Sequence, residues 1–491
     1  MNRVRGEFLH GARWLGISAA GNFILSLAAA VLLARLLTPE DFGAFFAALI
    51  PVLLASSLCD AGLGTGIVQR KELSSQHVAA AFWAVIVVGL ALGLSLFLAA
   101  PAIARALGEP RTIDLIVWLA PSIPLASAGR IPFALLQREV RFRPRAAILL
   151  TSHIIHTIAA AGFALSGLGV FSLVYAHLIR QALETAAAWR ISGMRPSARV
   201  SLPALGDLIP FSMPVLGTAL VQFVTSNADL YLIARGLGSG ALGFYNRAQH
   251  LVSTLGLQLG TVIFPSGLAA LSRIQDDPTA VGRTYLRICG ATALLLLPAI
   301  AGIYATAPAL VVALYGENWM EIIPLLRILA PAGALLALQA PIWPVLLALG
   351  RSKSVLFWNV VRAGTLAGCV AAALPWGLPA ACGGVVASLA VSNVVGHVLA
   401  LRATGARAWD LAAGLWAPII GSAAILALEM AIRSRFSATA SPGTYLAIVV
   451  PAGISVYAAA MALLNRRQLV DVLVATAEAA GLRSTSTPAE R

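Results

Sequence analysis

Long apolar stretches recur along the whole chain, and short segments rich in glycine, proline and arginine separate them. Each stretch has about 20 or more residues, enough for a helix rising about 1.5 Å per residue to cross a hydrocarbon core roughly 30 Å thick. The breaks predict about 14 transmembrane helices, at residues 12–34, 42–67, 78–104, 113–136, 146–166, 168–190, 207–234, 241–272, 284–314, 323–349, 354–374, 379–401, 408–432 and 443–464. The pattern therefore predicts an all-α, polytopic membrane protein.

Composition excludes a soluble globular protein. Apolar residues make up 59% of the 491 residues and charged residues only 11%, so the chain cannot hide its apolar surface from water. No stretch is long and polar enough to form a separate soluble domain. The net charge of +14 comes mostly from arginines in short loops, which is a signal of membrane topology and not of a nucleic-acid partner.

The loop arginines also predict the orientation of the chain. An even number of helices places both termini on one side, and we assign that side to the cytoplasm. The cytoplasmic segments then carry 23 basic residues and the opposite segments six. This bias is the one expected of cytoplasmic loops, and it depends on every helix being counted correctly. The bias therefore supports both the number of helices and cytoplasmic termini in a bacterial inner membrane.

The chain repeats itself at a distance of 200 residues. When Ala19–Ala48 is aligned with Ala219–Ala248, ten of the 30 pairs are identical, among them Gly43 with Gly243. Such parallel repeats are typical of transporters, whose substrate site lies between the two copies. We therefore expect two pseudo-symmetric six-helix lobes, at residues 1–200 and 201–402, followed by two appended helices at 403–464 and a cytoplasmic tail at 465–491.

Several segments resemble a known family. They lie in the first 350 residues and read Leu36-Leu37-Thr38-Pro39-Glu40-Asp41-Phe42-Gly43, Asp60-Ala61-Gly62-Leu63-Gly64, Leu135-Leu136-Gln137-Arg138-Glu139-Val140-Arg141-Phe142, Ala228-Asp229-Leu230-Tyr231-Leu232-Ile233, Leu242-Gly243-Phe244-Tyr245-Asn246-Arg247-Ala248 and Tyr315-Gly316-Glu317-Asn318-Trp319. Together they resemble the Wzx-type oligosaccharide flippases, the polysaccharide-transporter branch of the multidrug/oligosaccharidyl-lipid/polysaccharide exporter superfamily.

The resemblance implies a function and a set of partners. It implies two six-helix lobes that move undecaprenyl-diphosphate-linked sugars across the membrane by alternating access, for the synthesis of O-antigen, capsule or exopolysaccharide. A polysaccharide polymerase and export machinery are the protein partners that it suggests. The sequence names neither the glycan nor the driving force.

Charged residues within the predicted helices are the candidate site residues, because a charge at membrane depth costs a few kcal/mol or more. Arg180 lies near the middle of its helix, where its side chain reaches neither surface easily. It can pair with Glu184 one turn later, or its guanidinium can bind the substrate diphosphate. Both interpretations stay open.

Asp229 and Arg247 lie about six residues inside the same ends of two neighbouring antiparallel helices, and so about 9 Å deep. They can form an ion pair. The matching positions of the first repeat are Ala29 and Ala47, so the pair belongs to one lobe only. It can be a structural link, or a site for coupling or substrate.

Asp60 and Arg130 lie six or seven residues from the cytoplasmic ends of their helices and can pair in the same way. Glycines near Asp60 and prolines near Arg130 weaken both helices, as is typical of hinges or cavities. Arg362, about 12 Å inside its helix, is a further cavity candidate. The loop arginines 138, 141, 143 and 145 suit anionic lipid, or a first contact with substrate phosphates.

We expect no enzyme activity, cofactor or metal site, because the sequence has no phosphate-binding GxxxxGK[ST] loop, nucleophile elbow, HExxH or zinc-type cysteine spacing. Short outer loops argue against a sugar polymerase or ligase. Two alternatives in the same superfamily remain, a cation-coupled multidrug antiporter and a peptidoglycan-precursor flippase. An antiporter for organic cations needs carboxylates in its cavity, whereas this chain carries more arginine than acid at depth.

Overall fold

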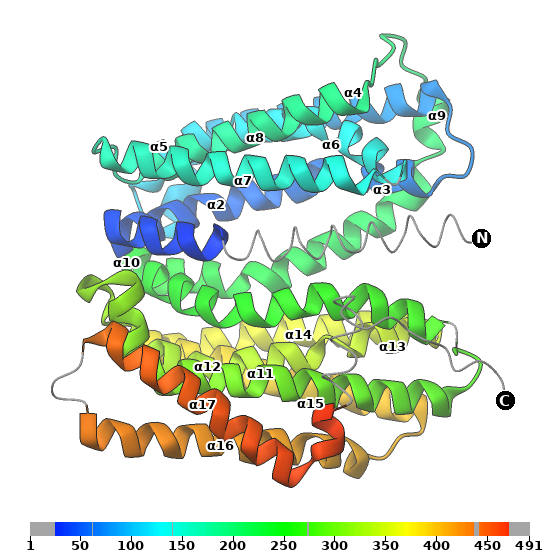
Figure 1. Ribbon diagram of the computed structural model, residues 1–491. Helices are drawn as coiled ribbons and strands as arrows, with labels where there is room; N and C mark the ends of the chain where they lie inside the picture. The colour runs from blue at the N-terminus through cyan, green and yellow to red at the C-terminus, as the bar shows by residue number, and fades with distance from the viewer. Residues whose placement is uncertain (1–24, 61, 140, 273, 437–440, 471–491) are drawn as a thin grey trace. The chain divides into compact units, whose positions relative to one another are not determined.

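The computed structural model describes residues 25–60, 62–139, 141–272, 274–436 and 441–470, without the side chains of residues 60, 142, 254–270, 272 and 434–436. The described part is helical and contains no strand (Figure 1). Helices of the required length and hydropathy provide 11 candidate membrane spans. The fold class predicted from the sequence, an all-α polytopic membrane protein, is confirmed.

Contacts divide the chain into two compact units. The first comprises residues 1–247 and 359–385, and the second comprises residues 248–358 and 386–491. The boundaries of these units differ from those of the two sequence repeats. The first unit also contains the first half of α10 (Ile209–Ser272) and most of α14 (Ser352–Ala373). The lobe boundaries expected from the sequence repeat stay predictions.

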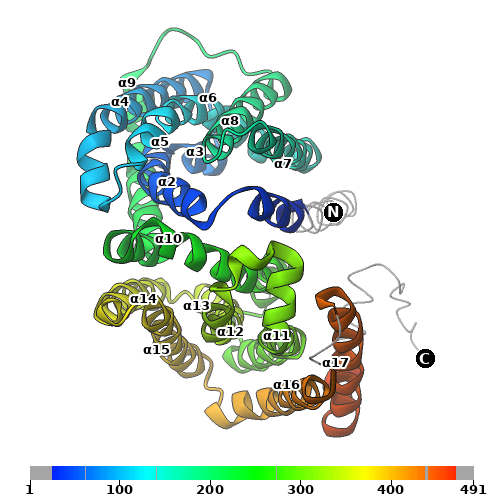
Figure 2. The same cartoon turned by 90° about the vertical axis from the view of Figure 1, so that its left-hand side faces the viewer.

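The first unit begins with an apolar helix at Leu25–Leu36. The helices that follow are α2 (Pro39–Asp60), α3 (Leu63–Gln69), α4 (Ser75–Leu107), α5 (Thr112–Leu119), α6 (Ser122–Arg138), α7 (Phe142–Leu165), α8 (Phe171–Ser192) and α9 (Leu202–Gly206). α6 packs against α3, α4 and α8, and α7 packs against α8. Figure 2 shows these helices nearly end-on.

The second unit continues from α10 (Ile209–Ser272), which the two units share. Its helices are α11 (Pro278–Tyr315), η1 (Glu317–Trp319), α12 (Ile322–Gln339), α13 (Ile342–Ala348), the greater part of α15 (Leu378–Thr404), α16 (Ala408–Phe436) and α17 (Pro442–Leu464). α14 (Ser352–Ala373) and η2 (Leu374–Trp376) precede α15. α11 packs against α12, α16 and α17.

Each helix expected from the sequence has a counterpart among the described helices, the first of them in part. α8 is missing from the candidate spans because Arg180 and Glu184 make it less apolar. The helices expected at 207–234 and 241–272 run together as α10, which is broken at Gly238. Gly238 has φ 84° and ψ 178°, a conformation open almost only to glycine, so the expected break is real.

Three predicted helices are interrupted, within the described residues, where glycine or proline weakens them. The helix expected at 323–349 divides into α12 and α13 at Ala340 and Pro341. The helix expected at 42–67 divides into α2 and α3 at Gly62, whose φ is 73°. The helix expected at 113–136 divides into α5 and α6 at Ala120 and Pro121. Proline lacks the amide hydrogen that continues a helix, and glycine alone accepts a positive φ without strain.

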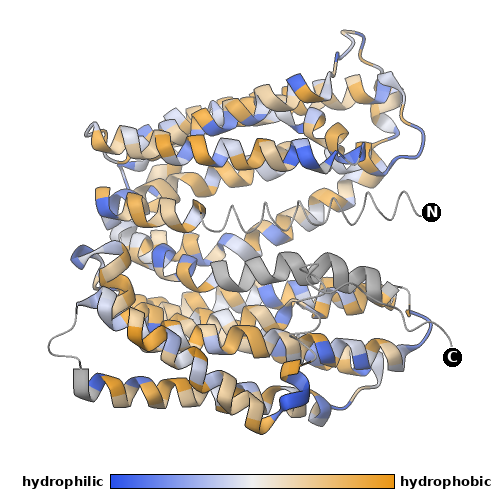
Figure 3. Ribbon diagram, viewed as in Figure 1, coloured by the Kyte–Doolittle hydropathy of each residue, from blue (hydrophilic) through white to orange (hydrophobic). Residues whose placement is uncertain are grey.

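Apolar side chains lie along the outside of the helices, as a lipid environment requires. On α4, Val87, Leu94 and Leu98 are 60% or more exposed, whereas Ala81 and Val85 are fully buried against α6 and α3. Figure 3 shows hydrophobic residues along the lengths of the helices. The exposed face of α4 therefore has the chemistry of a surface in contact with acyl chains.

A reciprocal backbone contact joins the two copies of the sequence repeat within the first unit. A Cβ added to Gly43 would lie 1.7 Å from the carbonyl oxygen of Ser239, and one added to Gly243 would lie 1.9 Å from that of Pro39. The repeat aligns position 39 with 239 and 43 with 243, so each glycine contacts the equivalent carbonyl of the other copy. Only glycine permits this approach of two backbones.

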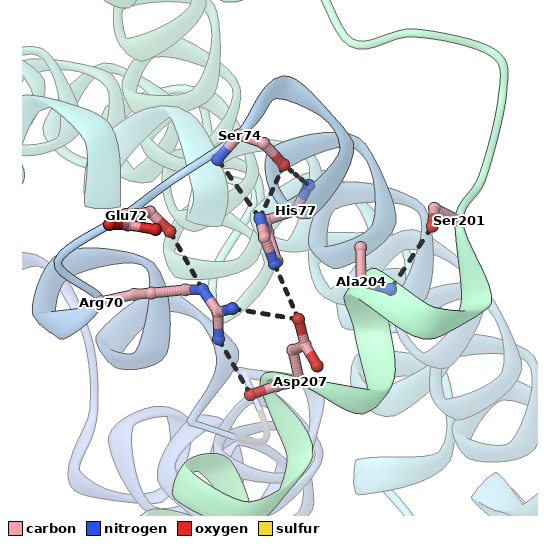
Figure 4. A network of polar contacts seen from close by, with 7 residues as sticks. All are labelled: Arg70, Glu72, Ser74, His77, Ser201, Ala204 and Asp207. Carbon is pink, nitrogen blue, oxygen red and sulfur yellow. Dashed lines mark hydrogen bonds and ion pairs between the residues drawn. The ribbon is translucent and has the colours of Figure 1, made fainter.

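A polar network fixes the start of α10 to the turn between α3 and α4 (Figure 4). Arg70 Nη2 lies 3.0 Å from Oδ2 of Asp207, and Nε2 of His77 lies 3.2 Å from the same oxygen. Ser74 caps α4 by accepting a hydrogen bond from the backbone N–H of His77 at 3.3 Å. The segment before α10 is therefore held by charge as well as by packing.

Candidate functional site

A cavity of about 360 Å³ lies inside the first unit, among α3, α6, α7 and α8. Its lining residues are Gly64, Thr65, Val68, Ala126, Gly129, Arg130, Phe133, Ala134, Gln137, Arg145, Leu149, Gln181, Glu184 and Thr185. This set contains two of the predicted site residues, Arg130 and Glu184. The structure thus brings together residues that are 54 positions apart in the sequence.

Helical spacing directs these side chains to one place. Arg145, Leu149 and Ser152 follow one another at i, i+4 and i+7 along α7, so they share a face. On α8, Gln181 and Glu184 are three residues apart and share the facing surface. The close packing of α7 on α8 then places both faces beside α6.

Glu184 is the only acidic residue in the described lining, and its charge is already balanced. Nε of Arg180 donates to Oε1 of Glu184 at 2.8 Å, and the hydroxyl of Ser152 donates to the same oxygen at 2.9 Å. The pair expected at i, i+4 therefore forms. Arg180 itself is 38% exposed, and Glu184 is 15% exposed.

The two lining arginines lack such a partner. Nη2 of Arg130 lies 3.5 Å from the hydroxyl of Ser56, at the limit of a hydrogen bond. The guanidinium of Arg145 makes no hydrogen bond or ion pair to any residue that the structure describes. The expected partner of Arg130, Asp60, has its side chain outside the described residues. The cavity therefore carries positive charge that no described carboxylate neutralises.

Asp229, Arg247 and Arg362 lie in a second cluster of the same unit. Asp229 is 2% exposed and accepts a hydrogen bond from the hydroxyl of Tyr245. Its charge acts on Arg362 of α14. Arg247, 6% exposed, places its guanidinium 3.7 Å above the ring of Phe42, a cation–π contact. The cluster joins three of the motifs that carried the family resemblance, at residues 36–43, 228–233 and 242–248.

Two of the loop arginines have structural contacts. Arg138 donates to the carbonyl oxygens of Ile67 at 2.8 Å and Lys71 at 3.1 Å, at and beyond the end of α3. Arg141 donates to the carbonyl of Ile191 at 2.9 Å, in the last turn of α8. Their role is therefore to satisfy the carbonyls that helix ends leave unpaired. Neither contact was expected from the sequence.

The sequence-based interpretation missed Arg145, Gln137 and Gln181 as lining residues. Arg145 was grouped with the loop arginines because it precedes the apolar part of its helix. The spacing of Arg145, Leu149 and Ser152 on one face was a signal that could have found it. No signal pointed to the glutamines, because an exposed and a lining glutamine look alike in a sequence.

The chain is similar in sequence to proteins of polysaccharide biosynthesis. The model of a family described as polysaccharide biosynthesis protein matches residues 32–324. The succinoglycan biosynthesis transport protein ExoT of Rhizobium meliloti (strain 1021) is 28% identical over 363 residues, which cover 73% of this chain and 72% of that protein. The lipopolysaccharide biosynthesis protein WzxC of Escherichia coli (strain K12) is 25% identical over 367 residues, 73% of each chain.

Solved structures with the same fold are transporters. The lipid II flippase MurJ in its inward closed conformation matches with a TM-score of 0.76 at 15% identity, over 92% of this chain and 99% of that one. An inward-facing multidrug resistance transporter of the MATE family matches with a TM-score of 0.62 at 16% identity, over 78% of this chain and 95% of that one. At these identities the likeness shows the fold alone.

Proposed function

Because the chain belongs to the polysaccharide biosynthesis protein family, we propose that it flips undecaprenyl-diphosphate-linked oligosaccharide units across a bacterial inner membrane. The relatives named for succinoglycan transport and lipopolysaccharide biosynthesis support a substrate destined for surface polysaccharide. The observation that supports the proposal within the structure is the cavity whose two lining arginines have no carboxylate partner among the described residues. Such a cavity suits an anionic diphosphate and opposes an organic cation.

Each predicted site residue has a role in this proposal. Arg130 and Arg180 attract the diphosphate from the cavity side, and Arg247 and Arg362 do so from the cluster around Asp229. Glu184 and Asp229 hold arginines in place, and Asp60 is a candidate for coupling transport to an ion. Transport of this kind requires no covalent chemistry, so the proposal includes no enzyme activity, cofactor or metal.

The sequence repeat supplies the proposed mechanism. Two lobes, residues 1–200 and 201–402, rock about the membrane midplane while the polyprenyl tail stays in lipid. The helices at 403–464 complete the membrane part, and both termini, with the tail at 465–491, lie in the cytoplasm. A polysaccharide polymerase and export machinery on the outer side consume the product.

Complementation tests the proposal. A bacterium that lacks its flippase and assembles surface polysaccharide would express the wild type, Arg130→Ala, Arg247→Ala or the control Arg190→Ala, at matched membrane levels. Arg190 is exposed at the end of α8 and lies outside the cavity lining. We expect polymer from the wild type and the control, and lipid-linked units stranded on the cytoplasmic leaflet in the other two.

The same strains distinguish the alternatives. Wild type that fails with several glycans but lowers the accumulation of cationic dyes would be a multidrug antiporter. Wild type that instead replaces a missing lipid II flippase would be a peptidoglycan-precursor flippase. Either result would overturn the proposal.

A further inference from the structure

The described lining of the cavity in the first unit carries more positive charge than the described carboxylates balance. Arg130 and Arg145 both line it, and the single lining carboxylate, Glu184, already binds Arg180 and Ser152. A charge withdrawn from water is costly unless an opposite charge or several hydrogen bonds compensate it. The described residues offer Arg145 neither, so its partly buried guanidinium is available to an anion from outside the chain.

The remaining donors around the cavity suit an oxyanion. Gln181 lines the cavity and makes no side-chain hydrogen bond to the described residues, so its amide hydrogens are available. Thr185 is not available, because its hydroxyl donates to the carbonyl of Leu125 at 2.8 Å. The planar guanidinium group presents paired N–H donors that match two oxygens of one phosphate.

We infer that Arg145 and Arg130 together bind a phosphate-type oxyanion, a phosphate or diphosphate, within this cavity, with Gln181 as a neutral donor. The volume of about 360 Å³ is at the lower end of ligand pockets, which run from about 300 to 1,000 Å³. It holds a phosphate headgroup with little space for attached sugar. The oligosaccharide of a flipped substrate therefore lies outside this cavity.

The inference adds a binding site to the proposed function. It rests on that function only for the identity of the lipid that carries the phosphate. It places Arg145, one of the four loop arginines, inside the cavity beside Arg130. It also assigns the phosphate to α6 and α7 of a single unit, where the binding arginines keep one geometry if the two lobes move.

Binding of inorganic pyrophosphate to the purified protein in neutral detergent tests the site. The variants are Arg130→Gln, Arg145→Gln and the control Arg190→Gln, and calorimetric titration gives the dissociation constant. A hydrogen bond to a charged group contributes enough that its loss should weaken binding about 10- to 100-fold in each cavity variant. The control should bind as the wild type does. Equal affinity in all four proteins would refute the site, and so would the absence of binding both to pyrophosphate and to the lipid-borne diphosphate described next.

Two further arms make the result specific. The first replaces pyrophosphate with undecaprenyl diphosphate carried in nanodiscs, in chloride buffer, and uses nanodiscs without that lipid as the blank. Binding only in nanodiscs supports the site with a lipid-borne phosphate, and binding in both supports it with a free anion as a sufficient ligand. The second arm is Arg145→Lys, which keeps the charge and should restore part of the affinity if loss in Arg145→Gln reflects the site and not misfolding.

Failure of the site and failure of the proposed function give different results. A chain that binds pyrophosphate through both arginines but restores no polymer keeps the anion site and loses the flippase assignment. A chain that restores polymer equally well in Arg145→Gln, with unchanged pyrophosphate affinity, keeps the flippase assignment and loses the site.

Discussion

Arginine has at least two different roles in this chain, and only the surroundings of each residue distinguish them. Arg138 and Arg141 donate to carbonyl groups at the ends of α3 and α8, whereas Arg145, a few positions later, lines the cavity without a described partner. All three count equally in the charge bias that orients the chain. The bias therefore predicts the side of the membrane well and the role of an individual arginine poorly.

Replacing Arg138 with alanine should destabilise the protein, because several carbonyl groups around the end of α3 would lose their donor at once. Its guanidinium reaches the carbonyl oxygens of Ile67, Val68, Arg70 and Lys71. Hydrogen bonds of a charged donor are worth about 1.5–3 kcal/mol each, and water would replace part of the loss, so we expect a decrease of about 1–3 kcal/mol. Thermal unfolding in detergent measures it.

Arg190→Ala is the matched control for that measurement, because Arg190 is exposed and makes no contact of this kind in the described structure. Arg138→Lys should recover little, since one ammonium group cannot span four carbonyls. Unfolding temperatures equal to the wild type in Arg138→Ala would contradict the capping role.

Local spacing explains which side-chain pairs a sequence can reveal. Arg180 and Glu184 are four residues apart on one helix, so their contact follows from helix geometry alone. The stacking of Arg247 on Phe42 joins residues about 200 positions apart, and nothing local indicates it. The cavity likewise cannot be inferred from local spacing, because its lining residues come from four helices.

At the scale of the element, the sequence predicts that each helix exists and that it spans the membrane. It predicts only some of the points at which the helices are interrupted. Apolar length fixes a membrane helix, since unpaired backbone groups are too costly in lipid for any other spanning segment here. Gly62 and Pro121 mark two of the breaks that the structure shows. The break expected between residues 234 and 241 is also present, at Gly238, whose backbone conformation is not helical.

Gly243→Ala should be destabilising, although alanine is normally the better helix former. Its methyl group would lie 1.9 Å from the carbonyl oxygen of Pro39, so the two backbones must separate, at a cost of about 1–3 kcal/mol. Gly217→Ala on the same helix is the control, because nothing lies within 4 Å of its added Cβ. We expect that variant to gain up to about 1 kcal/mol.

Unfolding temperatures of the two variants, measured side by side in detergent, give the comparison. A stabilised Gly243→Ala would show that the close contact with Pro39 does not exist in the folded protein. The reciprocal substitution, Gly43→Ala, should behave as Gly243→Ala does, since its Cβ meets the carbonyl of Ser239.

At the scale of the whole molecule, the charge bias predicts a definite orientation. Gly108 lies between α4 and α5, and Gly193 follows α8. With the N-terminus in the cytoplasm, the first position faces outward and the second inward. Alkaline phosphatase fused after Gly108 should therefore be active, and green fluorescent protein fused after Gly193 should fluoresce. The opposite pattern would reverse the orientation and with it the direction from which substrate enters.

The reciprocal contact of Gly43 and Gly243 also bears on the ancestry of the chain. Consider a dimer of two identical half-length chains. If the glycine of each chain contacts the same carbonyl group of the other chain, the contact is isologous, and a single glycine position in the sequence provides it twice. Gene duplication and fusion would preserve that contact without inventing a new surface. Afterwards each side could change alone, as proline at position 39 and serine at position 239 already show, while both glycines stay because their constraint is steric.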